Sequence, residues 1–152
     1  MKTRRGLEIR AATSADAPGV CDLLSASGYA TLPRSLAERL DAIRQAPGTA
    51  LLAAEWGPPS GLVVLHWYPT IDDDHPTAQI TTLLVAPEAR RRGIGRLLVK
   101  AASQAARVAG CGALELLVAP EQPDLQQFCR ATGFTEAGVC FLRPLRKSGL
   151  RL

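Results

Sequence analysis

This chain has few aromatic residues, no long apolar run and no regularly spaced cysteines. Three Phe, two Trp and two Tyr make up 5% of its 152 residues, and none of them is interleaved with the arginines. Modules that bind nucleic acid usually combine a basic face with stacked aromatic side chains, so we expect no nucleic-acid partner. No segment approaches the roughly 20 apolar residues of a membrane helix. The basic start of the chain is not followed by the apolar run of a secretory signal.

The cysteines lack the paired spacing of zinc sites or redox motifs, since they stand alone at Cys21, Cys111, Cys129 and Cys140. We therefore expect no metal site and reduced thiols, as in a cytoplasmic protein. Apolar residues make up 47% of the chain, which argues against disorder. The length is that of one domain, so we expect a single domain over residues 1–152, with a core over about 7–142 and a basic tail over 143–152.

What the sequence does contain is a basic, glycine-containing loop between an apolar run and an amphipathic segment. Residues 79–85 predict a strand, residues 86–93 a loop with three consecutive arginines, and Ile94 the start of a helix. The N-terminus of a helix presents unpaired N–H groups and a partial positive charge, so it binds anions. Glycine lets the backbone approach the anion closely, and arginine hydrogen-bonds to phosphate. The net charge of +4 also suits an anionic ligand, and the loop predicts a phosphate site.

Two common phosphate-binding motifs do not fit this loop. The dinucleotide-binding fingerprint requires a third glycine at the position of Leu98. The loop of the NTPases requires Gly-Lys-Ser/Thr, whereas here Gly95 is followed by Arg96. Neither a dinucleotide nor a nucleoside triphosphate is therefore indicated.

The signature that does fit is Gln/Arg-x-x-Gly-x-Gly/Ala, which is filled by Arg90, Gly93 and Gly95 and preceded by Val85-x-Pro87. It resembles the signature of the GNAT-type N-acyltransferases, in which this loop binds the pyrophosphate of acetyl-CoA. A second element supports the resemblance: residues 128–134, Phe-Cys-Arg-Ala-Thr-Gly-Phe, are similar to the family's Phe-Tyr-x-x-x-Gly-Phe.

Hydrophobic periodicity, cap signals and turn residues predict the order β-α-α-β-β-β-α-β-α-β. Helices follow capping signals at Thr13–Asp16 and Ser35–Glu38, and the sequence 57–61 predicts a hairpin turn. The expected strands are 7–11, 49–56, 62–68, 79–85, 113–118 and 139–142, and the later helices are 94–108 and 124–132.

This order is also that of the GNAT fold. The resemblance covers roughly residues 7–142 and is strongest over 80–134. It implies a mixed α/β sheet with helices on both faces, whose fourth and fifth strands splay apart and hold acetyl-CoA as co-substrate, without a metal. The residues that the resemblance assigns to the cofactor are Leu83, Leu84, Val85, Arg90, Arg91, Arg92, Gly93, Ile94, Gly95, Arg96, Gln122 and Phe128.

Proline cannot join a strand ladder, so we expect a β-bulge before Pro87 that frees backbone groups near Leu84 and Val85. By the resemblance, these backbone groups hydrogen-bond to the pantetheine arm and to the thioester oxygen.

The sequence departs from the family pattern at three positions. The tyrosine that often protonates the leaving sulfur is replaced by Cys129, which serves either as a weaker acid or as a small packing residue. The glutamate often found on the fourth strand is absent, because that strand offers only Gln79, Thr81 and Thr82. The asparagine before the last helix is replaced by Gln122, which keeps the amide on a longer arm.

A base must then come from elsewhere or from a water chain. His66 and Tyr68 share one face of the third strand, because side chains alternate along a strand. Histidine titrates near neutrality and is the natural candidate, although a structural role for His66 is the alternative. The loop residues Asp72–Asp74 and His75 either attract a cationic amine or form an ordinary solvated loop.

These features predict transfer of an acetyl group from acetyl-CoA to a primary amine of a small molecule or peptide, by direct attack in a ternary complex. The candidate catalytic residues are His66, Tyr68 and Cys129. The alternative function is a non-catalytic acyl-CoA-binding regulatory domain, which the missing Tyr and Glu favour. Many members of the family form dimers, and nothing in this sequence decides between a monomer and a homodimer.

Overall fold

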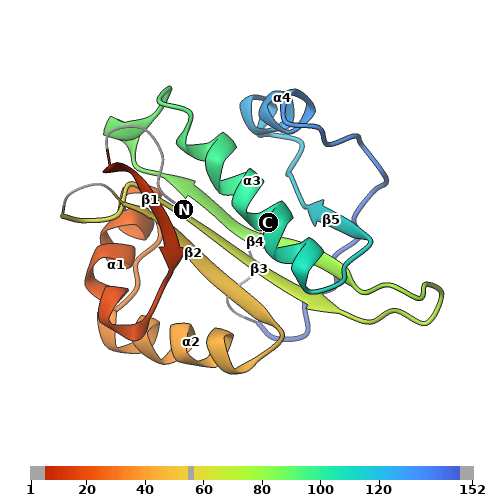
Figure 1. Ribbon diagram of the computed structural model, residues 1–152, viewed down its shortest axis with the longest axis horizontal. Helices are drawn as coiled ribbons and strands as arrows, with labels where there is room; N and C mark the ends of the chain where they lie inside the picture. The colour runs from red at the N-terminus through yellow and green to blue at the C-terminus, as the bar shows by residue number, and fades with distance from the viewer. Residues whose placement is uncertain (1–5, 55–56, 148–152) are drawn as a thin grey trace. The chain divides into compact units, whose positions relative to one another are not determined.

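The computed structural model describes residues 6–54 and 57–147 and has the predicted mixed α/β architecture (Figure 1). Its chain divides into two compact units, residues 1–115 and 116–152, which are described separately. The sheet has the strand order β1-β2-β3-β4-β5. The strands are β1 (Glu8–Ala11), β2 (Gly48–Ala54), β3 (Gly61–Tyr68), β4 (Thr77–Val85) and β5 (Ala113–Leu116). The helices are α1 (Ala17–Ala26), α2 (Pro33–Gln45), α3 (Ile94–Val108) and α4 (Pro123–Ala131).

Helices cover both faces of the first unit's sheet. Strands β1 to β4 pair antiparallel in sequence, so alternate side chains of β3 point to opposite faces. A Cβ placed on Gly61 would lie within 3 Å of Leu98 and Ile94, which puts α3 on the face of Gly61, Val63 and Leu65. The opposite face is covered beside β2 by α1 and α2, where Leu52 is fully buried. Further along that face, His66 is only half-buried and Tyr68 is 39% exposed.

The first helical segment begins at the capping box that the sequence predicts. Thr13 and Asp16 form the reciprocal side-chain and backbone contacts of this motif, over a 3-10 turn that leads into α1. Arg10 adds two hydrogen bonds to the Asp16 carboxylate, at 2.7 and 2.9 Å. These bonds and the backbone N–H of Thr13 lower the pKa of Asp16 to about 2.

The second helix starts earlier than the Ser35 cap predicts. Its N-cap is Leu32, with Pro33 in the first turn, and neither Ser35 nor Glu38 forms a capping box. Proline has its φ angle fixed near the helical value and has no N–H to lose there, so it opens a helix readily.

Two strand predictions in the C-terminal part differ from the structure. Strand β5 ends at Leu116 instead of Val118 and is not buried as expected, since its residues alternate between exposed and half-buried. Residues 139–142 form no strand, and Val139 and Phe141 are 81% and 92% exposed. Local β-propensity favours an extended chain there, but a strand also needs a partner, and within residues 57–147 this segment has none. The element order therefore ends at α4.

The other boundaries are close to the predictions. Strand β2 starts at Gly48, and Trp56, its predicted last residue, lies outside the described residues, as do residues 148–152 of the basic tail. Residues 143–147 have no helix or strand. No helix within the described ranges is long and apolar enough to cross a membrane.

We predict that Asp16→Asn lowers the free energy of unfolding by about 1 kcal/mol at pH 7, the typical value of a lost helix cap. The folded-state pKa lies below the ordinary 3.8, so the wild-type contribution is present above about pH 4 and is lost as the pH falls through about 2. In urea unfolding, Asp16→Asn should have a lower free energy of unfolding than the wild type at pH 7 but not at pH 2. The exposed Asp41→Asn in α2 is the matched control, and an equal loss in both variants would contradict the capping role.

Candidate functional site

The junction between β4 and α3 has the geometry of an anion site. The ladder continues past Val85, because the Ala86 N–H donates to Ser60 O at 2.8 Å, and a 3-10 turn over Pro87–Ala89 follows. Gly93 is the N-cap of α3 with φ +79°, a left-handed conformation that favours glycine. No side chain caps this end, and the Leu97 N–H donates a helical hydrogen bond to Gly93 O at 3.1 Å. The N–H groups of the first turn, at Ile94 and Gly95, therefore have no acceptor within the helix.

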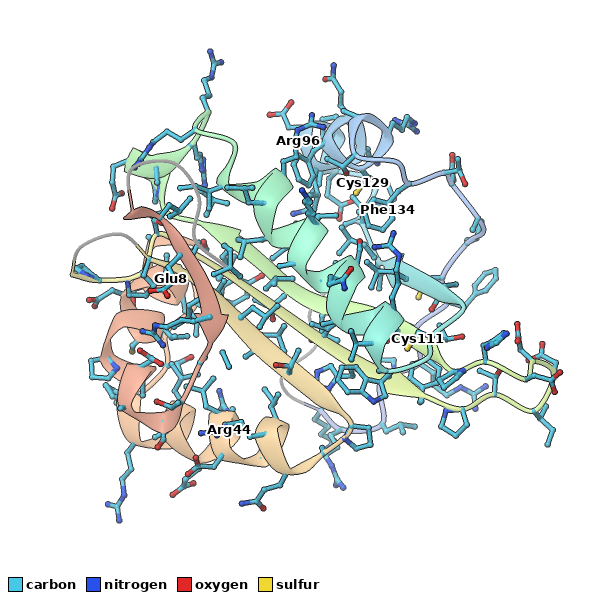
Figure 2. The ribbon with its side chains drawn as sticks, viewed as in Figure 1. Glu8, Arg44, Arg96, Cys111, Cys129 and Phe134 are labelled. Atoms are coloured by element: carbon cyan, nitrogen blue, oxygen red, sulfur yellow. The ribbon has the colours of Figure 1, made fainter. Side chains whose placement is uncertain are left out.

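The basic side chains gather around this helix start. Arg90, Arg91, Arg92 and Arg96 are all exposed, whereas Ile94 is buried and anchors the first turn to the core. Arg96 is labelled in Figure 2 on the first turn of α3. Arg91 also has a left-handed backbone, with φ +66°. Turn conformations can direct successive backbone N–H groups toward a common point, as in anion-binding nests.

A cavity of about 380 Å³ lies at the same junction, between α1, the turn at residues 58–60 and residues 86–89. Its charged lining residues are Asp22, Glu88 and Arg92. Because two of these three groups are carboxylates, the arginines and the helix start suit an anion better than this cavity does.

Strand β4 has a free edge next to the anion site. The Gly112 N–H donates to Pro76 O at 2.9 Å, so β5 begins level with the start of β4. Strand β5 has four residues and β4 has nine, so no strand in the described part of the chain runs beside Leu83–Val85 on that side. These three residues are half-buried. Their outward backbone groups can pair with an extended ligand, as they would with another strand.

The β-bulge lies at Thr81, not near Leu84 and Val85 as expected. Val64 pairs with Thr82 and Leu65 pairs with Ile80, so Thr81 is the extra residue on β4. The register is regular again at Leu84 and Val85, up to the end of the strand. Pro87 ends the ladder without disturbing it, because it follows the last paired residue.

His66 is held at this bulge. Its Nε2 atom lies 3.1 Å from the Thr81 Oγ1 atom. On the other side, a Cβ at Gly48, which pairs with His66, would lie 3.2 Å from the ring Nδ1 atom and 2.8 Å from Leu65 O. The ring therefore occupies space that any larger residue at position 48 would fill. The sequence pattern did not reveal either Thr81 or Gly48 as a partner, because strand register alone brings them together.

Tyr68 lies on the same face of β3 and hydrogen-bonds to a carboxylate. Its hydroxyl donates to Glu115 Oε1 at 3.3 Å, reaching from β3 across β4 to β5. Partial burial, together with the charge and the hydrogen bond of Glu115, raises the pKa of Tyr68. This phenol stays protonated at neutral pH, so it can donate a hydrogen bond or a proton but cannot act as a base. No local pattern in the sequence indicates this contact with Glu115.

The hairpin loop that follows Tyr68 is exposed. The Asp73 carboxylate accepts a hydrogen bond from the backbone N–H of His75 at 2.8 Å, which is a local turn. The His75 side chain lies beside Gly112 at the start of β5. These contacts are those of an ordinary solvated loop.

The remaining predicted residues belong to the second unit. Gln122 is exposed at the N-cap of α4 and makes no side-chain cap, and Phe128 is half-buried. Cys129 is 8% exposed, and burial raises the pKa of its thiol. Gly133, with φ +98°, ends the helix in a Schellman motif, in which the Phe134 N–H donates to Cys129 O at 2.9 Å. Figure 2 shows Cys129 and Phe134 close together, and these contacts favour the packing role of Cys129.

Within residues 6–54 and 57–147, no group of three or more His, Cys, Asp or Glu side chains is placed to hold a metal ion.

A mixed sheet, a free strand edge and a glycine-capped helix start define an acyltransferase-type α/β fold. The model of the acetyltransferase (GNAT) family matches residues 17–134, and the chain therefore belongs to the GNAT family of acetyltransferases. No curated protein matches the sequence significantly.

Solved structures agree with this assignment. A protein of Agrobacterium tumefaciens str. C58 described as an acetyltransferase has 27% identity and a TM-score of 0.81, over 90% of this chain and 99% of that one. Glucosamine-6-phosphate N-acetyltransferase from Arabidopsis thaliana has 14% identity and a TM-score of 0.78, over 92% and 99%. AAC(6')-Iy, solved with the bisubstrate analogue CoA-S-monomethyl-acetylneamine, has 22% identity and a TM-score of 0.78, over 91% and 97%.

We predict that Thr81→Val frees the His66 ring from its fixed orientation. The valine has a similar volume but no hydroxyl, so the Nε2 contact is lost and the two neutral tautomers become more evenly populated. The ¹⁵N chemical shifts of the ring report this change. The chain has two histidines, so His75 is an internal control whose shifts should not move. Unchanged His66 shifts would show that Thr81 does not orient the ring.

Proposed function

We propose that this protein transfers an acetyl group from acetyl-CoA to a primary amine of a small molecule or peptide, by direct attack in a ternary complex. The observation that supports this most strongly is the glycine-capped start of α3 directly after the free edge of β4. This arrangement offers N–H groups to a pyrophosphate and a strand edge to the amides of the pantetheine arm. The family's use of acetyl-CoA, and the CoA-based ligand of AAC(6')-Iy, fit the same assignment.

Each part of the cofactor would have a partner in the first unit. The N–H groups of Ile94 and Gly95, with the arginines around them, would hold the pyrophosphate. The backbone of Leu83–Val85 would bind the pantetheine amides. Acetyl-CoA supplies a thioester whose carbonyl oxygen gains negative charge during attack, and backbone N–H groups of the bulged strand would stabilise that charge.

His66 is the best-placed candidate for the base. It lies at Thr81, where the free edge of β4 begins, on the face that α1 and α2 leave open. It would accept the proton that the attacking amine must lose. Tyr68, kept protonated beside Glu115, is a donor on the same face, for the acceptor or for the leaving thiolate.

The alternative is a non-catalytic acyl-CoA-binding domain. The absence of a glutamate on β4 and the burial of Cys129 favour it, because neither of the family's usual proton-transfer groups is then available. Steady acetylation of any amine would rule this alternative out.

We predict that Gly93→Val weakens the binding of acetyl-CoA at least 10-fold in titration calorimetry. Nothing lies within 4 Å of a Cβ at this position, so the side chain would project into the space where the anion approaches. Gly110, at the other end of α3, has φ +87° and equally open surroundings, so Gly110→Val carries the same backbone strain as a matched control. Equal weakening by both substitutions would show strain alone and would remove this loop from the binding site.

We predict that His66→Gln lowers kcat/KM by 100-fold or more and removes the limb of the pH–rate profile that rises toward alkaline pH, as loss of a general base does. Acetyl-CoA affinity should not change, because the substitution leaves the helix start intact. The control is His75→Gln in the exposed loop. If the pH–rate profile of the His66 variant keeps its rising limb, the proton of the attacking amine is accepted by water or by another group and not by His66.

A further inference from the structure

The face of the sheet beside His66 ends in a carboxylate that forms no ion pair with any of the described residues. Glu115 is exposed on β5, and it accepts a hydrogen bond from the Tyr68 hydroxyl. No Lys, Arg or His among the described residues forms an ion pair with it. An ionised carboxylate has about four lone-pair sites, and a single phenol occupies one of them. Most of the hydrogen-bonding capacity of Glu115 is therefore left for a ligand.

The arrangement of strands sets the distance between this carboxylate and the candidate base. His66 and Tyr68 are separated by two residues on one face of β3, which corresponds to roughly 7 Å. Strand β5 lies two strand spacings from β3, or roughly 10 Å, and the Tyr68 side chain spans most of that width. Tyr68 pairs with Thr77, a small residue on the neighbouring strand β4. A ligand lying along this face would meet His66 at one end and Glu115 at the other.

We propose that Glu115 is a specificity-determining residue that selects acceptors with a second, cationic amino group at a distance from the amine that is acetylated. The proposal rests on the proposed function, with His66 marking the reacting end. The first amine lies neutral at His66, while the second remains an ammonium and donates hydrogen bonds to Glu115. The Tyr68 hydroxyl fixes the orientation of the carboxylate, and its ring offers an apolar surface to the connecting chain.

The charge distribution of the first unit fits such an acceptor. The arginines stand at the end of β4 where α3 begins, which suits the anionic cofactor. The start of β4 is at the hairpin end of the strand, as Figure 1 shows, and Glu115 stands beside that half. A cofactor and an acceptor of opposite charge would thus be drawn to opposite ends of one strand.

The test measures release of CoA from acetyl-CoA with matched acceptors. 1,6-Diaminohexane and n-hexylamine share one reacting amine and one chain length and differ by the second ammonium. We expect the wild-type protein to prefer the diamine by about 10-fold in kcat/KM, mainly through KM, since hydrogen bonds to charged groups contribute on this scale. Glu115→Gln should abolish the preference by raising KM for the diamine to that for n-hexylamine, and Glu115→Lys should reverse it. A series from 1,3-diaminopropane to 1,8-diaminooctane should show an optimum length.

The matched control is Glu8→Gln. Glu8 is also an exposed strand carboxylate, but it lies on β1, the opposite edge strand of the sheet (Figure 2). The Glu8→Gln variant should keep the wild-type preference for the diamine over the monoamine. Equal use of diamine and monoamine by the wild type, or equal effects of the Glu8 and Glu115 variants, would overturn the proposal while the acetyltransferase function stands. If acetyl-CoA binds and no amine in either series is acetylated, the proposed function itself fails.

Discussion

The close approach of α3 to Gly61 fixes the place where this protein can hold an anion. Gly61 pairs with Val85, the last residue of β4, and Ile94 and Leu98 of α3 pack directly over it. Any side chain at position 61 would come within 3 Å of both residues and push the helix away. Burial of Ile94 and Leu98 contributes about 1.5–3 kcal/mol each, so the first turn is held firmly against the end of the strand. The unpaired N–H groups of α3 therefore lie beside the last residues of β4.

Strand β4 then serves three purposes at once. On one side it is paired continuously with β3, which fixes its register. On the other side, the short β5 leaves its second half without a neighbouring strand, and backbone groups that would otherwise satisfy another strand can bind an extended ligand. The bulge at Thr81 falls where this free edge begins, and it brings the Thr81 hydroxyl to His66. The same irregularity in the pairing of β3 and β4 thus positions the candidate base.

Local patterns predicted the parts of this fold that depend on neighbours in sequence. The amphipathic α3, the capping box at Thr13 and the glycine ends of the helices follow from spacing and backbone freedom, and all are found. Predictions that depended on distant partners were less successful. The strand at 139–142 is absent because extended propensity does not supply a partner, and β5 is shorter and more exposed than its apolar residues suggest. The start of α2 was misplaced because Pro33 outweighs the serine cap.

The site shows the same division. The sequence alone predicted the loop proposed to bind an anion, since the roles proposed for Arg90, Gly93 and Gly95 depend on backbone conformation and charge within one short segment. It also placed His66 and Tyr68 on one face, because side chains alternate along any strand. Only the tertiary structure decided their partners. Thr81, Gly48 and Glu115 come from three different strands, and pairing register and one bulge bring them to this face. Register depends on the whole sheet, so no local pattern in the chain could have revealed these contacts.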